Sequence, residues 1–343
     1  MTMASKPKTA FVFAGGGSFG AVQVGMLRAL VAHGLRPDLV VGSSVGAMNG
    51  AYYAGNPTEE GVARLAAIWR SLRRRDVFPI TPQALLGFLR RRDFLLGSHG
   101  LYRLVHEHLP YRDLQDAKVP LHIVATDLLS GEPVVLSEGE AATAIVASTA
   151  IPAAFAPVRR NGQYLADGAI TSCTPVRVAV MRGATRLIVL PTGYACAREM
   201  PPQGAVANAL HALTLLIARQ VKAELQSLNA SIDFHVAPPL CPLMGSPYDF
   251  SQTAELIERA AARTQKWLAE GGLERREIPH EMNAHKHHDA GSLWLCRGLD
   301  VGRPASAEDA LDIRILGLGT LPLWRSWSGR RLRQFLSAGT LAV

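Results

Sequence analysis

A serine between two glycines is the residue of this chain best suited to act as a nucleophile. Ser44 lies in residues 42–46, GSSVG, after the apolar run 39–41 and before a run of small residues. A serine at such a strand-to-helix corner exposes its hydroxyl, and the flanking Gly42 and Gly46 let strand and helix pack closely. The helix N-terminus favours negative charge that develops nearby. The pattern predicts that Ser44, rather than Ser43 at an x position, attacks an ester carbonyl.

A run of glycines follows the first apolar segment, residues 10–14. Residues 15–20, GGGSFG, satisfy G-x-G-x-x-G through Gly15, Gly17 and Gly20, which is also the pattern of a dinucleotide-binding loop. That alternative needs an acid at the end of the second strand, and the nearby Asp38 precedes that strand instead. Three consecutive backbone N–H groups equally suit an oxyanion hole, in which the loss of one donor raises the activation free energy by about 3–4 kcal/mol. Beside the serine motif, the glycines predict the oxyanion hole.

A serine nucleophile needs a base, and Asp167 is the best placed. It follows the short apolar run 164–166 and precedes Gly168 and Ala169, at the same kind of sheet-end turn as Ser44. A carboxylate there could take the serine proton directly. Six histidines fall in expected helices, the expected cap or a strand, without a loop motif: His33, His99, His106, His108, His122 and His211.

A second group of histidines, within residues 280–288, lies in a polar stretch near the end of the chain. No carboxylate or cysteine completes a recognisable ligand spacing with them, so we expect a solvated loop and no metal. The four cysteines, listed next, are widely spaced without a CxxC motif, which indicates free thiols rather than disulfides. They are Cys173, Cys196, Cys241 and Cys296.

The opening of the chain alternates between strand and helix patterns, which predicts a parallel sheet with right-handed crossovers. Residues 58–117 are arginine-rich with helical patterning, and we interpret them as a helical cap inserted into the sheet domain. Further strands are expected at 121–125, 133–136 and 187–190, and helices at 141–148, 204–229 and 252–270. The expected domains are 10–195 (catalytic), 196–272 (a helical part packed on it) and 273–343 (a tail).

Composition is that of a folded protein, with 48% hydrophobic and 19% charged residues in a chain of 343. No apolar run reaches the roughly 18–20 residues of a membrane span. The polar N-terminus followed directly by a short strand does not resemble a signal peptide, so the expected compartment is the cytoplasm.

A net charge of +8 admits nucleic acid, an anionic membrane or a solvated basic face as explanations. The arginines of 70–75 and 90–92 form short clusters beside large apolar residues, and residues 324–336 form an amphipathic pattern on a helix. This interleaving suits peripheral contact with an anionic membrane better than a nucleic-acid groove. Solvated arginine faces, and a C-terminal helix docked on its own domain, remain as alternatives.

Taken together, the three motifs resemble those of the patatin-like phospholipase family, in the same order and context. The segments 120–127, 131–136 and 147–158 resemble that family too, so the likeness covers about residues 10–195. Residues 236–268 resemble the downstream helical part of bacterial members. The resemblance implies a three-layer α/β/α sandwich with a mainly parallel sheet, and hydrolysis of fatty acyl esters by a Ser–Asp dyad without metal or cofactor.

Carried over by position, Ser44 is the nucleophile, Asp167 the base, and the amides of Gly15, Gly16 and Gly17 the oxyanion hole. Family members often carry Arg or Lys just before the last glycine of the first motif, where this chain has Phe19. The missing charge favours a neutral ester or lysolipid over a phospholipid. A dinucleotide-binding oxidoreductase and a catalytically silent membrane-associated scaffold remain as alternatives, distinguished by dinucleotide binding and by the absence of ester cleavage.

Overall fold

The computed structural model describes residues 7–78 and 96–283, apart from 195, 198, 199, 201 and 204, together with 285 and 287. The chain divides into two compact units. The first comprises Met1–Arg198 and Thr214–Ala290, and it contains the central sheet. The second comprises Glu199–Leu213 and Gly291–Val343. The expected cap residues 79–95, with the arginines of 90–92, and the amphipathic stretch 324–336 lie outside the described residues.

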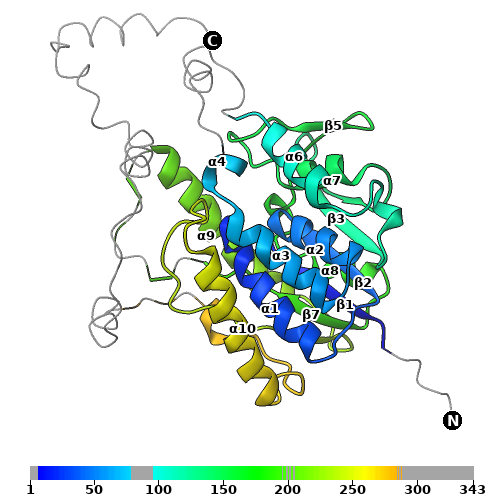
Figure 1. Cartoon of the computed structure of the whole chain (residues 1–343), viewed down its shortest axis with the longest axis vertical. Helices are drawn as coiled ribbons and strands as arrows, with labels where there is room; N and C mark the ends of the chain where they lie inside the picture. The colour runs from blue at the N-terminus through cyan, green and yellow to red at the C-terminus, as the bar shows by residue number, and fades with distance from the viewer. Residues whose placement is uncertain are drawn as a thin grey trace, which may run out of the picture. The chain divides into compact units, whose positions relative to one another are not determined.

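A mixed sheet of eight strands forms the centre of the first unit, in the order β5-β6-β3-β2-β1-β7-β8 with β4 paired to β3 (Figure 1). Five strands run parallel: β1 (Thr9–Phe13), β2 (Leu39–Ser43), β3 (Leu121–Asp127), β7 (Arg186–Leu190) and β8 (Asp233–Val236). Three run antiparallel to their neighbours: β4 (Pro133–Leu136), β5 (Val158–Arg160) and β6 (Gln163–Asp167). The expectation of a mainly parallel sheet is confirmed.

Both faces of the sheet are buried, because successive side chains of each strand enter different apolar clusters. In β1, Phe11 and Phe13 belong to one cluster and Ala10 and Val12 to the other. Successive side chains of a strand point to opposite faces, so the sheet separates two helical layers. This is the three-layer α/β/α arrangement that the sequence predicted.

The helices divide between the two faces. The Phe11 side is covered by α1 (Gly20–Ala32), α2 (Val45–Gly55), α3 (Glu59–Ser71), α6 (His99–His108), α7 (Ala141–Ser148) and α10 (Thr253–Ala269). Of these, α1, α3 and α10 lie side by side (Figure 1). The Val12 side is covered by α8 (Val176–Met181) and by the apolar residues Val221 and Leu225 of α9 (Ala205–Gln226). The short helix α4 (Arg74–Val77) follows α3.

Buried side-chain amides tie three helices to the ends of two strands. Gln23 of α1 donates from Nε2 to the carbonyls of Ala14, 2.7 Å away, and Leu190, 2.9 Å away. Asn49 of α2 donates to Gln23 Oε1 at 2.9 Å, and Trp69 of α3 donates to Asn49 Oδ1 at 2.8 Å. Buried polar groups are costly unless paired, so this chain of bonds fixes α1 and α2 against the ends of β1 and β7.

Two features of the sheet were missed by the sequence analysis. The β5–β6 hairpin turns at Asn161 and Gly162, whose φ values are 49° and 81°. Positive φ at both central residues is typical of the Asn-Gly hairpin turn. Strand β8, Asp233–Val236, was also missed. Among the described residues, no helix is both long and apolar enough to cross a bilayer.

Candidate active site

Ser44 occupies a sharp corner between β2 and α2. Its φ of 55° and ψ of −128° lie in a region that residues with a side chain rarely adopt. The corner is closed by two glycines that leave no room for a Cβ. A Cβ on Gly42 would lie 2.4 Å from the carbonyl oxygen of Gly46, and one on Gly46 would lie 2.3 Å from that of Phe13. The predicted strand–serine–helix corner is therefore present, with its glycines required by contact.

The structure brings Ser44 and Asp167 into hydrogen-bonding contact. The buried Ser44 Oγ donates to Asp167 Oδ2 at 2.7 Å. The register of the sheet explains this approach: Ser43 pairs with Val124 of β3, and Asp167 pairs with the next residue, Ala125. The nucleophile candidate and the carboxylate, which are 123 positions apart, thus meet across β3.

The carboxylate of Asp167 is held in a buried, oriented state. Its second oxygen, Oδ1, accepts the backbone N–H of Ala169 at 2.8 Å. Burial raises the pKa of Asp167 from 3.8 to about 6, while the hydrogen bonds from Ser44 and Ala169 oppose that rise. A carboxylate with a pKa close to neutrality can both accept and return a proton.

The glycine loop lies against this pair. A Cβ on Gly15 would lie 3.2 Å from the Cβ of Ser44. The Gly15 amide, predicted to be an oxyanion donor, instead donates to the carbonyl oxygen of Cys173 at 2.9 Å. Within the described part of the chain, the amides of Gly16 and Gly17 donate to no protein acceptor. The donors available to an oxyanion in this loop are therefore two rather than three.

The other predicted motif residues mark starts of helices around the site. Gly20 begins α1, and Gly168 begins the 3₁₀ helix η3 (Gly168–Ile170) directly after Asp167. Phe19, which replaces the cation expected from the family pattern, is buried in the apolar core. Its position therefore provides packing in place of a charge.

Two functional-site residues were not predicted from the sequence. Ser148, at the end of α7, accepts the backbone N–H of Ser44 at 2.9 Å and donates to the carbonyl of Val124 at 2.6 Å. Thr192, after β7, donates to the carbonyl of Gly15 at 2.6 Å. The one sequence feature that pointed to Ser148 was its place in the family-like segment 147–158. Its role, however, depends on contacts between segments that are distant in the sequence.

The dinucleotide alternative conflicts with the position of its required acid. Asp38 precedes β2, and its Oδ2 accepts the backbone N–H of Thr9 at the start of β1, 2.7 Å away. The glycine loop instead follows the end of β1. In parallel strands these positions lie at opposite edges of the sheet, so Asp38 cannot hold a ribose bound at the loop.

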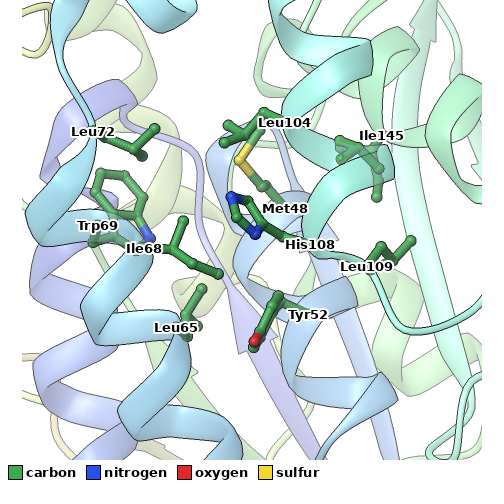
Figure 2. A pocket seen from close by; sticks show the side chains of 11 residues that line it. Met48, Tyr52, Leu65, Ile68, Trp69, Leu72, Leu104, His108, Leu109 and Ile145 are labelled. Carbon is green, nitrogen blue, oxygen red and sulfur yellow. The ribbon is translucent and has the colours of Figure 1, made fainter.

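An apolar pocket opens between helices of the layer that carries Ser44 (Figure 2). Met48 and Tyr52 contribute from α2, Ile68 from α3, Leu104 from α6 and Ile145 from α7. The space inside it that a water-sized molecule could occupy is about 30 Å³. Met48 lies one helical turn after Ser44, which places one wall of the pocket on the helix that follows the serine.

Comparisons with known proteins identify related sequences. The family model described as patatin-like phospholipase matches residues 11–180. An uncharacterized NTE family protein of Mycobacterium tuberculosis is 32% identical over 176 residues, which cover 50% of this chain and 45% of that protein. Patatin-like phospholipase domain-containing protein 7 of Rattus norvegicus is 26% identical over 186 residues, which cover 54% of this chain and 13% of that protein. The chain thus spans less than half the length of these relatives.

Solved structures were compared as well. VipD of Legionella pneumophila gives a TM-score of 0.41 at 17% identity, covering 78% of this chain and 67% of that one. Human GIVD cytosolic phospholipase A2 gives a TM-score of 0.39 at 13% identity, covering 78% of this chain and 59% of that one. From the family match over residues 11–180 and the related sequences, the chain belongs to the patatin-like phospholipase family.

Proposed function

We propose that this protein is a lipid acyl hydrolase that cleaves fatty acyl esters with a Ser44–Asp167 dyad. The observation that carries the proposal is the 2.7 Å hydrogen bond from Ser44 Oγ to Asp167 Oδ2. It joins a serine at a strained corner to a buried carboxylate whose pKa is raised to about 6. Membership of a phospholipase family supports an ester of a lipid as the substrate.

In the proposed reaction, Ser44 Oγ attacks the ester carbonyl while Asp167 takes the hydroxyl proton. The amides of Gly16 and Gly17 stabilise the oxyanion of the tetrahedral intermediate. Asp167 then returns the proton to the leaving alcohol, which leaves an acyl group on Ser44. A water molecule, deprotonated by the same carboxylate, attacks the acyl-enzyme and releases the fatty acid, and the proton returns to Ser44.

The substrate that we propose is a neutral ester or a lysolipid with a long acyl chain. The pocket beside α2 is lined by aliphatic and aromatic side chains together with His108 (Figure 2), and an acyl chain gains about 0.8 kcal/mol for each methylene buried. Phe19 brings no charge to meet a phosphate near the glycine loop. Both observations favour an apolar tail over an anionic head group as the recognised feature.

Peripheral contact with an anionic membrane is a further part of this proposal. Of the first arginine cluster, Arg70 is paired with Glu258 at 2.6 Å, and Arg73 donates to backbone carbonyls of its own segment. Arg75 is exposed and is therefore the member of this cluster best placed to meet a lipid head group. A scaffold without catalysis would use the same surface but would not cleave esters.

A fluorophosphonate probe with mass mapping tests the nucleophile, combined with hydrolysis of p-nitrophenyl esters. We expect Ser44→Ala to abolish labelling and hydrolysis, and Asp167→Asn to lower kcat about 10²- to 10⁴-fold. Ser43→Ala is the matched control, because its buried hydroxyl has no hydrogen-bond partner among the described residues, and labelling should persist. Label on another serine, or full activity in either dyad variant, would exclude the assignment.

A further inference from the structure

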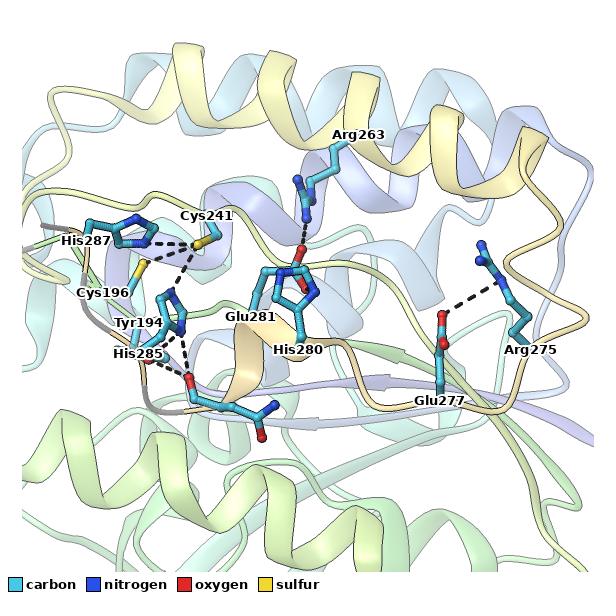
Figure 3. A network of polar contacts seen from close by, with 11 residues as sticks. Tyr194, Cys196, Cys241, Arg263, Arg275, Glu277, His280, Glu281, His285 and His287 are labelled. Atoms are coloured by element: carbon cyan, nitrogen blue, oxygen red, sulfur yellow. Dashed lines mark hydrogen bonds and ion pairs between the residues drawn. The ribbon is translucent and has the colours of Figure 1, made fainter. Parts of the chain in front are cut away.

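Two thiols and two imidazoles converge at one place near the end of the described chain. Cys196 follows β7, Cys241 follows β8, and His285 and His287 lie in the segment after η4 (His280–Met282) (Figure 3). Each residue offers one ligand atom, which is the sulfur of a cysteine or one ring nitrogen of a histidine. These four atoms all lie within 4.8 Å of one another. This cluster takes no part in the proposed hydrolysis.

Three distances among these atoms are close to those between the ligands of a tetrahedral zinc ion. Two sulfurs about 2.3 Å from a common ion, at the tetrahedral angle, lie about 3.8 Å apart, and a sulfur and a nitrogen lie about 3.5 Å apart. The Cys196 and Cys241 sulfurs are 3.8 Å apart. Cys241 Sγ lies 3.2 Å from the Nε2 atoms of both His285 and His287. A disulfide would need sulfurs about 2.05 Å apart, and both thiols are free.

The imidazole of His285 is oriented for coordination. Its Nδ1 lies 2.7 Å from the carbonyl oxygen of Asn283, which can only accept a hydrogen bond. Nδ1 therefore carries the proton, and Nε2 presents its lone pair toward Cys241. Tyr194 donates its hydroxyl to the same carbonyl at 2.9 Å and packs edge-on against the His285 ring. Metal-bound histidines are typically fixed by such a bond from the other ring nitrogen.

We propose that Cys196, Cys241, His285 and His287 form a structural zinc site. Two thiolates and two neutral imidazoles are a ligand set that selects zinc, and four protein ligands close the coordination sphere, as in structural rather than catalytic sites. The two thiolates balance the charge of the ion. The proposal departs from the expectation of no metal, which considered only ligand spacing along the chain.

The site would fasten the segment after α10 to the loops that follow β7 and β8. Upstream of the ligands, this segment is already held by the ion pair of Glu281 with Arg263 (Figure 3). Lys222 also donates to Asn283 Oδ1 at 2.6 Å. The two loops also touch each other, since Ala197 N–H donates to the carbonyl of Leu243 at 3.2 Å. These contacts hold the ligands near one another and reduce the ordering cost of binding an ion.

The test is the zinc content of the full chain, purified under reducing conditions without a polyhistidine tag and passed through a weak chelator. Elemental analysis should find about one zinc per chain, and Cys241→Ser and His285→Asn should lose it. His280→Asn is the matched control, because His280 lies in the same segment with a side chain that is 89% exposed. Cobalt in place of zinc should give a thiolate-to-cobalt absorption band that Cys241→Ser weakens.

Wild-type protein provides a readout that does not depend on the variants folding. Stripping the metal with a strong chelator should lower Tm, and restoring zinc, but not magnesium, should recover it. Zinc absent from the reduced, folded chain would overturn the proposal. So would zinc content unchanged in both ligand variants, or a Cys196–Cys241 disulfide found by mass mapping of the protein as purified, before any chelator is added.

Discussion

Replacing Asp167 with asparagine should stabilise the protein at neutral pH although it removes the proposed base. Burial raises the pKa of this carboxyl from 3.8 to about 6 in the folded chain. Between these values the folded state holds a proton that the unfolded state has released, so stability is full below 3.8 and falls as pH rises to about 6. The two-unit shift corresponds to about 3 kcal/mol lost by neutral pH. Asparagine stays neutral and avoids this loss.

The measurement is denaturant unfolding of wild type and Asp167→Asn at about pH 4 and about pH 7.5, both outside the titration window. The asparagine amide can still accept from Ala169 N–H and donate to Ser44 Oγ, so its own hydrogen bonding changes little with pH. We expect the stability of the variant relative to wild type to rise by about 3 kcal/mol between the two pH values. The same pKa predicts that wild-type kcat/KM falls about tenfold per unit below about pH 6, because a protonated Asp167 cannot accept the serine proton.

Ser44→Ala is the control, since it also removes activity but keeps the carboxylate. Its unfolding should retain the full pH dependence of wild type or exceed it, because the lost hydrogen bond had favoured the ionised form of Asp167. If Asp167→Asn and wild type instead lose stability in parallel across the range, the buried carboxylate ionises without cost. The environment of Asp167 would then not raise its pKa toward that of a base at neutral pH.

Three further substitutions test the parts around the dyad. Ser148→Ala leaves the Ser44 amide unpaired and should cost about 1–3 kcal/mol in denaturant unfolding; an unchanged midpoint would contradict this. Gly17→Ala places a Cβ at φ 61° against a backbone oxygen and should lower kcat up to about 10³-fold with smaller effects on KM. Ile68→Trp should fill the apolar pocket and lower kcat/KM for long-chain esters about tenfold, which corresponds to the burial free energy of about two methylenes. Its activity on short-chain esters should stay near wild type, as should the activity of the control Ala67→Trp, whose side chain is exposed.

The parts of the site that lie within one strand–loop–helix unit could be predicted from the sequence. Ser44 and Gly15–Gly17 each sit directly between a strand and a helix, so their local order determines their place at the end of that strand. The position of Asp167 could not be predicted from its local sequence alone, because β6 runs antiparallel to β3 after a hairpin that was not predicted. The sequence placed it at a turn, while the pairing of Asp167 with Ala125 determines which side chain it meets.

Contacts between distant segments account for what the sequence missed. The Gly15 amide was expected to be free to bind an oxyanion. It instead donates to the carbonyl of Cys173, a residue that is distant in the sequence. Ser148 has the same character, since its hydroxyl joins α7, β3 and the serine corner. Neither role leaves a pattern in the neighbouring residues, so no local argument could identify it.

The cysteine–histidine cluster was missed for a related reason, and its place in the sheet links it to the candidate active site. Neighbours in the order β2-β1-β7-β8 run parallel, so their carboxyl ends share one edge. That edge carries, in the order of the strands, Ser44, the glycine loop, Cys196 and Cys241. The loop that contains Cys241 also reaches the glycine loop directly, because the carbonyl of Pro247 accepts Ser18 N–H at 2.7 Å. An ion that fixes this loop would therefore help to hold the glycine loop, which carries the proposed oxyanion donors, without contacting the substrate.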